Sequence, residues 1–144
     1  MLIRIILIVG LLAVASLAYL WWSRRNGVVR RVEVPGSVSS ETLGAQRGFR
    51  ATFVQFSTPL CAKCPGTATL LKRVASEYED VTHIEIDASV RLDLARQFDV
   101  MRTPTVLVLN TDGVVVARMS GPPSVMQARE ALEAAPPETA PYSI

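Results

Sequence analysis

The chain has 144 residues, of which 49% are hydrophobic and 19% are charged, and its formal net charge at pH 7 is +2. This length accommodates one domain of ordinary size and an additional segment. The charge is unevenly distributed, because residues 1–31 contain five arginines and no acid, whereas residues 32–144 contain ten basic and thirteen acidic residues. The larger part of the chain is therefore slightly acidic, and the overall positive charge gives no argument for a nucleic-acid partner.

The N-terminal segment is the most hydrophobic part of the chain. Residues 5–23 carry no charge, and as a helix rising about 1.5 Å per residue they would span roughly 28 Å, close to a bilayer's hydrocarbon core. The run ends in Tyr19, Trp21 and Trp22, a composition typical of a membrane interface. We therefore predict a retained transmembrane anchor over residues 1–23.

Two further points concern the processing and orientation of this segment. The alternative to an anchor is a cleaved signal peptide, since residues 13–15 (Ala-Val-Ala) resemble a small-residue cleavage site. More arginines follow the apolar run than precede it, and the positive-inside rule then places the rest of the chain in the cytoplasm. The prediction is a single-pass protein of the cell membrane with a cytoplasmic domain, and an extracytoplasmic domain is the alternative.

After the anchor, the pattern predicts three regions. Residues 24–48 form a basic juxtamembrane segment and linker, with a first strand over 28–34 that Pro35 ends, and a short helix that reaches Leu43. Residues 49–134 form the domain core. Residues 135–144, which are rich in proline, form a disordered tail.

Within the core, apolar runs separated by turn residues predict an α/β domain. The expected elements are a buried strand over 51–57, a helix from the cysteines to about 78, a strand over 81–86, a helix over 90–98, a hairpin of strands 105–109 and 114–119, and a helix from 121 to about 134. This order predicts a central mixed β-sheet flanked by helices.

Cys61 and Cys64 are the only cysteines in the chain, and Ala62 and Lys63 separate them. They lie between a predicted strand and a predicted helix, so the first sulfur is expected at a helix N-terminus, where unpaired N–H groups and the helix dipole favour a thiolate. The thiolate is the nucleophile of disulfide exchange, and the second cysteine can reach back to close a disulfide. The pair is therefore predicted to be a redox centre.

Two other interpretations of the cysteines are weaker. Structural zinc requires four Cys or His ligands, and the chain offers only His83 in addition. A purely structural disulfide across two residues would close a very short loop and would restrain the unfolded chain little. We expect disulfide chemistry that requires no metal and no organic cofactor.

With these residues in place, the chain resembles the thioredoxin family over roughly residues 28–134. Three motifs occur in the family's order: the strand–CxxC–helix unit, Thr103-Pro104 before a later strand, and Asp112-Gly113 followed by Arg118 and Gly121. The resemblance implies a thioredoxin-like fold and thiol–disulfide oxidoreductase activity. It also implies a cis peptide bond before Pro104, with Thr103 and Pro104 binding an extended substrate chain beside the cysteines.

The chain departs from the family pattern at several of these positions. Leu60 stands where the family usually has tryptophan, and Ala62-Lys63 where it usually has Gly-Pro. Gln55 aligns with a buried acid that takes the proton of the second cysteine, and an amide cannot exchange a proton at ordinary pH. His83 aligns with a buried lysine and titrates near neutrality, so it is the candidate replacement base. His83 and Gln55 are therefore the candidate proton relay, the alternative being a partly buried histidine without a chemical role.

The predicted function is a membrane-anchored thiol–disulfide oxidoreductase in which Cys61 attacks and Cys64 resolves the mixed disulfide. Its partners would be a protein thiol or disulfide substrate and a redox partner that resets the pair. The alternatives are a redox-inert thioredoxin-like docking module and a copper or zinc carrier that uses the CxxC. The sequence leaves the direction of electron flow open, and Arg102 is interpreted either as part of the substrate groove or as ordinary surface.

Overall fold

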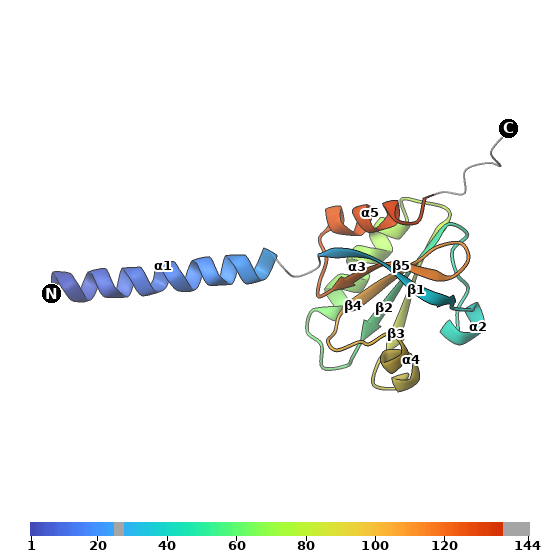
Figure 1. The fold of residues 1–144 in the computed structure, drawn as a ribbon, viewed down its shortest axis with the longest axis horizontal. Coiled ribbons are helices and arrows are strands. Elements are labelled where there is room, and N and C mark those ends of the chain that lie inside the picture. Colours follow the sequence, from blue (N-terminus) through green and yellow to red (C-terminus); the bar gives the residue numbers. More distant parts are fainter. Residues whose placement is uncertain (25–27, 137–144) are drawn as a thin grey trace.

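The computed structural model describes residues 1–24 and 28–136. Helix α1 (Leu2–Arg24) is followed by a domain of strands and helices (Figure 1). The strands are β1 (Val29–Ser37), β2 (Ala51–Ser57), β3 (Val81–Asp87), β4 (Thr105–Leu109) and β5 (Val114–Ser120). The helices of the domain are α2 (Ser40–Leu43), α3 (Cys64–Ala75), α4 (Leu92–Gln97) and α5 (Val125–Glu133).

Helix α1 coincides with the predicted anchor. Its segment Leu2–Trp22 is long and apolar enough to cross a membrane, and it is not buried against other described residues. A signal sequence near an N-terminus has the same length and composition. The helix therefore indicates a membrane span or a signal sequence, and the side of the membrane on which the domain lies stays a prediction.

The five strands form one sheet in the order β1-β5-β4-β2-β3. Strands β2 and β3 are parallel, and the other neighbouring pairs are antiparallel. Helices α3 and α5 cover one face, and α2 and α4 pack on the other (Figure 1). The predicted mixed sheet with flanking helices is confirmed.

Strand β2 lies inside the sheet and every residue of it is buried. Side chains alternate along a strand, so Phe53 packs with α3 and α5 while Val54 and Phe56 pack with α4. A strand covered on both faces favours apolar residues, which explains why Ala51, Phe53, Val54 and Phe56 make this segment mostly apolar. Thr52, Gln55 and Ser57 are the buried polar residues of this strand, and the side chain of Gln55 bonds to the backbone of Cys64.

The β4–β5 hairpin closes through the predicted turn. Asn110 accepts a hydrogen bond from the N–H of Gly113, and its side chain accepts another from the N–H of Val114. Gly113 has a φ of +80°, and a Cβ there would meet the carbonyl oxygen of Val38 at 2.6 Å. Only glycine satisfies both the backbone conformation and this close approach.

The N-terminal strand is longer than predicted. Strand β1 continues past Pro35 to Ser37, with register shifts between Arg31 and Val34 and between Val34 and Ser37. Because β1 is an edge strand, an irregular position there can hold proline without breaking an interior ladder. The predicted end of the strand at Pro35 was therefore wrong.

The helices of the core also differ from the prediction at their ends. Helix α5 begins at Val125 instead of residue 121, because Ser124 caps it and forms a capping box with Gln127. Helices α3 and α4 are both shorter than predicted. Ala135, predicted to begin the tail, is fully buried in the core, and residues 137–144 of that tail lie outside the described residues.

Candidate active site

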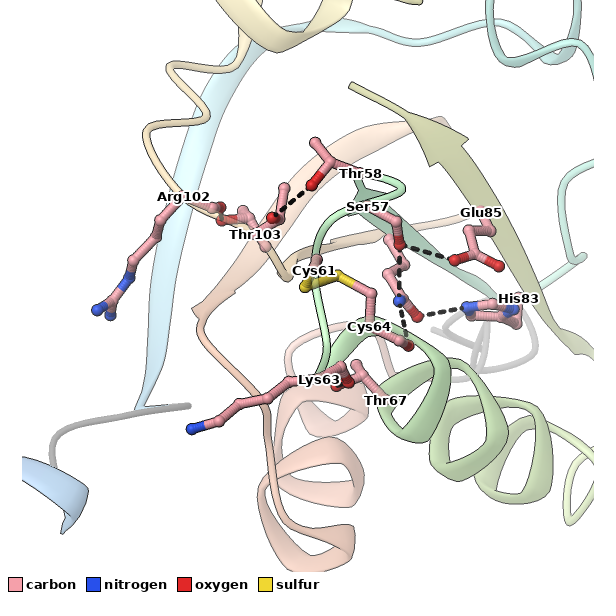
Figure 2. Close-up of a disulfide and its surroundings, with 12 residues drawn as sticks. Ser57, Thr58, Cys61, Lys63, Cys64, Thr67, His83, Glu85, Arg102 and Thr103 are labelled. Carbon is pink, nitrogen blue, oxygen red and sulfur yellow. Dashed lines mark hydrogen bonds between the residues drawn. A yellow bond between two sulfur atoms is a disulfide. The ribbon is translucent and has the colours of Figure 1, made fainter. Parts of the chain in front are cut away.

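Cys61 and Cys64 lie where the chain passes from β2 into α3 (Figure 2). A disulfide joins them, with their Cα atoms 5.5 Å apart. Helix α3 begins at Cys64, later than predicted, so Cys61 lies in the preceding turn, where its N–H donates to the carbonyl of Thr58. Among the described residues no side chain caps this helix, which leaves its positive end directed at the disulfide.

The two cysteines differ in exposure. Cys61 is half-buried, whereas Cys64 is only 2% exposed. An incoming disulfide can therefore approach the sulfur of Cys61 but not that of Cys64. The sulfur of Cys61 is therefore the more accessible of the two, and the predicted roles of an attacking Cys61 and a resolving Cys64 stay predictions.

A shallow groove of about 330 Å³ passes the disulfide. Within the domain it is lined by Thr58, Leu60, Cys61, Ala62, Lys63, Arg102, Thr103, Pro104, Gly121 and Pro122. The Thr103–Pro104 peptide bond is cis, as predicted. The hydroxyl of Thr103 lies 3.3 Å from that of Thr58, which connects the loop before β4 to the loop before the cysteines. The structure thus brings the predicted substrate-binding pair to the predicted redox pair.

The groove is apolar and cationic. Leu60, in the position of the family's usual tryptophan, is 97% exposed and offers an apolar contact beside Cys61. Lys63 and Arg102 are the only charged side chains that line the groove within the described residues. Figure 2 shows both extending outward on the same side of the disulfide. Arg102 is thereby part of the groove, and its interpretation as unrelated surface is not supported.

Beneath Cys64 lies a buried polar network centred on Gln55, whose side chain is 0% exposed. The Gln55 Nε2 group donates to the carbonyl of Cys64 at 3.0 Å and to Ser57 Oγ at 2.9 Å. Ser57 Oγ in turn donates to Glu85 Oε1 at 2.7 Å. The dashed lines in Figure 2 follow these bonds from the start of α3 to the edge of the sheet.

The hydrogen-bond polarity of this network assigns the tautomer of His83. The Cys64 carbonyl can only accept, so the Gln55 amide must present Nε2 to it and Oε1 to His83. His83 Nε2, 3.0 Å from that oxygen, must therefore carry the hydrogen. In the part of the chain that the structure describes, the buried Nδ1 atom has no hydrogen-bond partner. That lone pair is where a neutral His83 can take a proton.

The pKa of His83 is lowered from its ordinary value. Burial is the main cause because it disfavours the charged ring, and the positive charge of Lys72 acts in the same direction. The carboxylate of Glu85 opposes them. His83 is therefore neutral at pH 7, which is the state required of a proton acceptor.

Sequence reasoning found Gln55 and His83 but missed Ser57 and Glu85. A signal for them is present in the alternation of the two strands. Gln55 and Ser57 share one face of β2, and Glu85 is paired with Gln55 in the parallel register. The pairing of these strands cannot be known from one sequence, although polar residues at alternate positions in the buried strand β2 and in its neighbour β3 are the pattern that would have pointed to it.

Comparisons with known proteins agree with this fold and site. A family model described as thioredoxin matches residues 45–134. No curated protein gave a match. Solved structures that the chain resembles include a mutant thioredoxin from Halobacterium salinarum (15% identity, TM-score 0.59, covering 72% of this chain and 90% of that one) and a thioredoxin from Fasciola hepatica (22%, 0.54, 62% and 84%). Thioredoxin F from spinach chloroplast is similar at 26% identity and a TM-score of 0.53, covering 61% of this chain and 72% of that one.

The fold and the pair of a half-buried and a buried cysteine define a thioredoxin-like domain with a general thiol–disulfide oxidoreductase site. The family match covers more than half of the chain. The chain belongs to the thioredoxin family.

Proposed function

We propose that this protein is a membrane-anchored thiol–disulfide oxidoreductase that exchanges disulfides with protein substrates through Cys61 and Cys64. The observation that carries the proposal is the half-buried Cys61 in an open groove beside Pro104, joined to a Cys64 that is 2% exposed. Such a pair admits a substrate sulfur at one position and keeps the second sulfur for the intramolecular step.

In the reducing direction the exchange has two steps. The Cys61 thiolate attacks one sulfur of a substrate disulfide, forms a mixed disulfide and releases the other substrate sulfur as a thiolate. Cys64, after losing its proton, attacks Cys61 Sγ, which breaks the mixed disulfide and releases the second substrate thiolate. Two electrons pass to the substrate and the Cys61–Cys64 disulfide remains. The reverse sequence oxidises a substrate dithiol.

Thr103 and Pro104 are the proposed substrate-binding residues. They line the same groove as Cys61, and the contact between the Thr103 and Thr58 hydroxyls joins their loop to the loop before the cysteines. An extended polypeptide laid along Thr103 would present its sulfur to Cys61. Holding the two sulfurs at reacting distance is the main contribution that such a groove makes to the rate.

The proposed proton relay of Cys64 consists of His83 and Gln55. Gln55 positions the Cys64 backbone but cannot take its proton, since an amide does not titrate. His83 is neutral and contacts Gln55 through Nε2, and its Nδ1 atom, which has no hydrogen-bond partner among the described residues, can take a proton. Proton uptake on Nδ1 would leave the Nε2–Gln55 hydrogen bond intact, so Cys64 would stay in place during the transfer.

The N-terminal helix is proposed to act as a tether. A tether raises the concentration of the domain near membrane-bound substrates without adding any contact. The arginines that follow the helix favour a cytoplasmic domain, with an extracytoplasmic one as the alternative.

The test is the reduction potential of the full-length protein in a zwitterionic detergent, measured by equilibration with glutathione and alkylation of free thiols. Equilibration of both cysteines supports an oxidoreductase, and a value near about −270 mV or about −120 mV would indicate a reductant or an oxidant. Cysteines that never equilibrate would contradict the proposal and favour a docking module. Stoichiometric copper or zinc in the reduced protein would contradict it in favour of a metal carrier.

A further inference from the structure

Three arginines converge on a second hollow next to the CxxC groove. This hollow, of about 820 Å³, is lined by Val28, Arg30, Val32, Asp99, Met101, Arg102, Thr105, Arg118 and Ser120. Arg30 comes from β1, Arg118 from β5, and Arg102 from the loop between α4 and β4. We call this surface the arginine hollow.

Arg30 and Arg118 are direct partners across the β1–β5 ladder. Side chains directly opposite each other in an antiparallel pair lie on the same face and close together, so two like charges there destabilise the sheet. Asp99 is the only acid that lines the hollow among the described residues, and three cations against one carboxylate leave it positive. An anion held there would offset the repulsion that the register imposes.

The three guanidinium groups are held to different degrees. Arg118 donates to the carbonyls of Phe98 and Asp99, both at 2.6 Å, so it is fixed in position and contributes mainly its charge. Arg102 donates from one nitrogen to the Ser120 carbonyl at 2.8 Å. Arg30 is exposed and, in the described part of the chain, its side chain makes no hydrogen bond. Arg30 and Arg102 therefore retain donors for a ligand.

Two observations indicate a polypeptide as the source of the anion. Arg102 lines both the CxxC groove and the arginine hollow, so a chain bound along Thr103 can continue into the hollow. Met101 is 83% exposed and Val28 is 44% exposed, and both line the hollow. A site with apolar side chains beside its cations suits an acidic peptide better than a small inorganic anion.

We propose that the arginine hollow binds the acidic flank of the substrate polypeptide, so that preferred substrates carry Asp or Glu close to the cysteine that reacts with Cys61. This inference rests on the proposed disulfide exchange and names its substrate class. Charge complementarity of this kind raises the rate of encounter and selects among partners more than it adds affinity.

The test uses disulfide-linked peptides that are identical except for the residues beside the cysteine, which are acidic, neutral or basic. The second-order rate constant of exchange is measured with the reduced full-length protein in a zwitterionic detergent. We expect the acidic peptide to react about fivefold faster than the neutral one, which is the size of effect that exposed ion pairs produce. This difference in rate should decrease as salt is added. The basic peptide should react more slowly than the neutral one.

Arg30→Glu is the informative variant, and Arg31→Glu is its matched control. Both change the charge by the same amount on neighbouring residues of β1, but Arg31 is paired with Ala117 and lies on the opposite face of the sheet. We expect Arg30→Glu to abolish the advantage of the acidic peptide and Arg31→Glu to keep most of it. Arg30→Glu also places a carboxylate opposite Arg118, so its melting temperature should not fall, which shows that the variant is folded.

The possible results separate this inference from the proposed function. Equal rates for acidic and neutral peptides would overturn the inference while leaving the oxidoreductase intact. An equal loss of preference in Arg30→Glu and Arg31→Glu would also overturn it, because the effect would then be one of net charge. Binding to vesicles of anionic lipid that depends on Arg30, without a peptide preference, would assign the hollow to the membrane surface. No exchange with any peptide would overturn the proposed function and this inference together.

Discussion

The two cysteines of one disulfide lie in opposite surroundings. Cys61 opens onto a groove that carries the cations Lys63 and Arg102 and the exposed side chain of Leu60. Cys64 lies above a buried network in which Gln55 holds its carbonyl. The first environment suits contact with external partners, and the second holds the backbone of Cys64 in place. The difference shows that two intervening residues are enough to place one sulfur at an open groove and the other in a buried environment.

The largest expected effect comes from the cysteines themselves. Cys61→Ser should remove all exchange with a peptide disulfide, and Cys64→Ser should stop the cycle after the first step. Each substitution should lower turnover by at least about a hundredfold, because a covalent step is lost. Turnover is measured with the full-length protein and an excess of substrate. The comparison between the two sulfurs breaks down if Cys61→Ser keeps turnover and Cys64→Ser alone loses it.

The buried side of the comparison is tested by Gln55→Ala. The substitution removes the hydrogen bonds that Gln55 makes with the Cys64 carbonyl, Ser57 Oγ and the Nε2–H group of His83. We expect it to lower the free energy of unfolding by about 3 kcal/mol. Denaturant titration at pH 7 measures this loss. Gln97→Ala, at an exposed position on α4, should change stability by less than about 0.5 kcal/mol. Equal effects of the two substitutions would mean that the network does not hold Cys64.

The proposed relay is tested by the rate of the resolving step. His83→Ala should slow release of the mixed disulfide by about tenfold, as is usual for losing a general base of modest effect. The readout is single-turnover decay of a preformed Cys61 mixed disulfide between about pH 6 and 8, the range in which imidazole titrates. A rate that is unchanged across that range would leave His83 with a packing role only.

The smallest expected effect is on stability as a function of pH. The pKa of His83 is lowered in the folded chain by burial, so below about pH 6.5 the unfolded chain takes up a proton that the folded chain does not. Stability is therefore fully present above that pH and decreases as the pH falls toward the folded-state pKa of His83. His83 is the only histidine in the chain, so His83→Gln should remove the decrease between pH 7.5 and pH 5.5. A decrease that persists in His83→Gln would assign it to other groups.

The sequence was sufficient for features that depend on local pattern. The mostly apolar segment of residues 51–57 predicted the buried strand, and the positions of Cys61, Cys64 and Pro104 predicted the groove and the cis bond. Each of these follows from neighbouring residues or from a family motif. The ends of the elements were less predictable. The Pro-rich turn predicted that α5 begins at residue 121, whereas Ser124 caps the helix and it begins at Val125.

Features that depend on strand register could not be predicted. The Arg30–Arg118 pair exists only because β1 lies along β5 in one particular alignment, and a shift by one residue would move Arg30 to the other face. The contact of Glu85 with Ser57 likewise requires the parallel pairing of β2 and β3. Long-range pairing of this kind is determined by the whole core, and periodicity within one strand does not report it.

The most direct test of the division between the two cysteines is the alkylation of the reduced full-length protein with limiting iodoacetamide, with the modified sulfur located by mass spectrometry. The account predicts that Cys61 is modified first, and that Cys64 reacts at a comparable rate only after the protein is unfolded. Modification of Cys64 in the folded protein as fast as Cys61 would contradict the separation of an accessible Cys61 sulfur from a buried Cys64 sulfur.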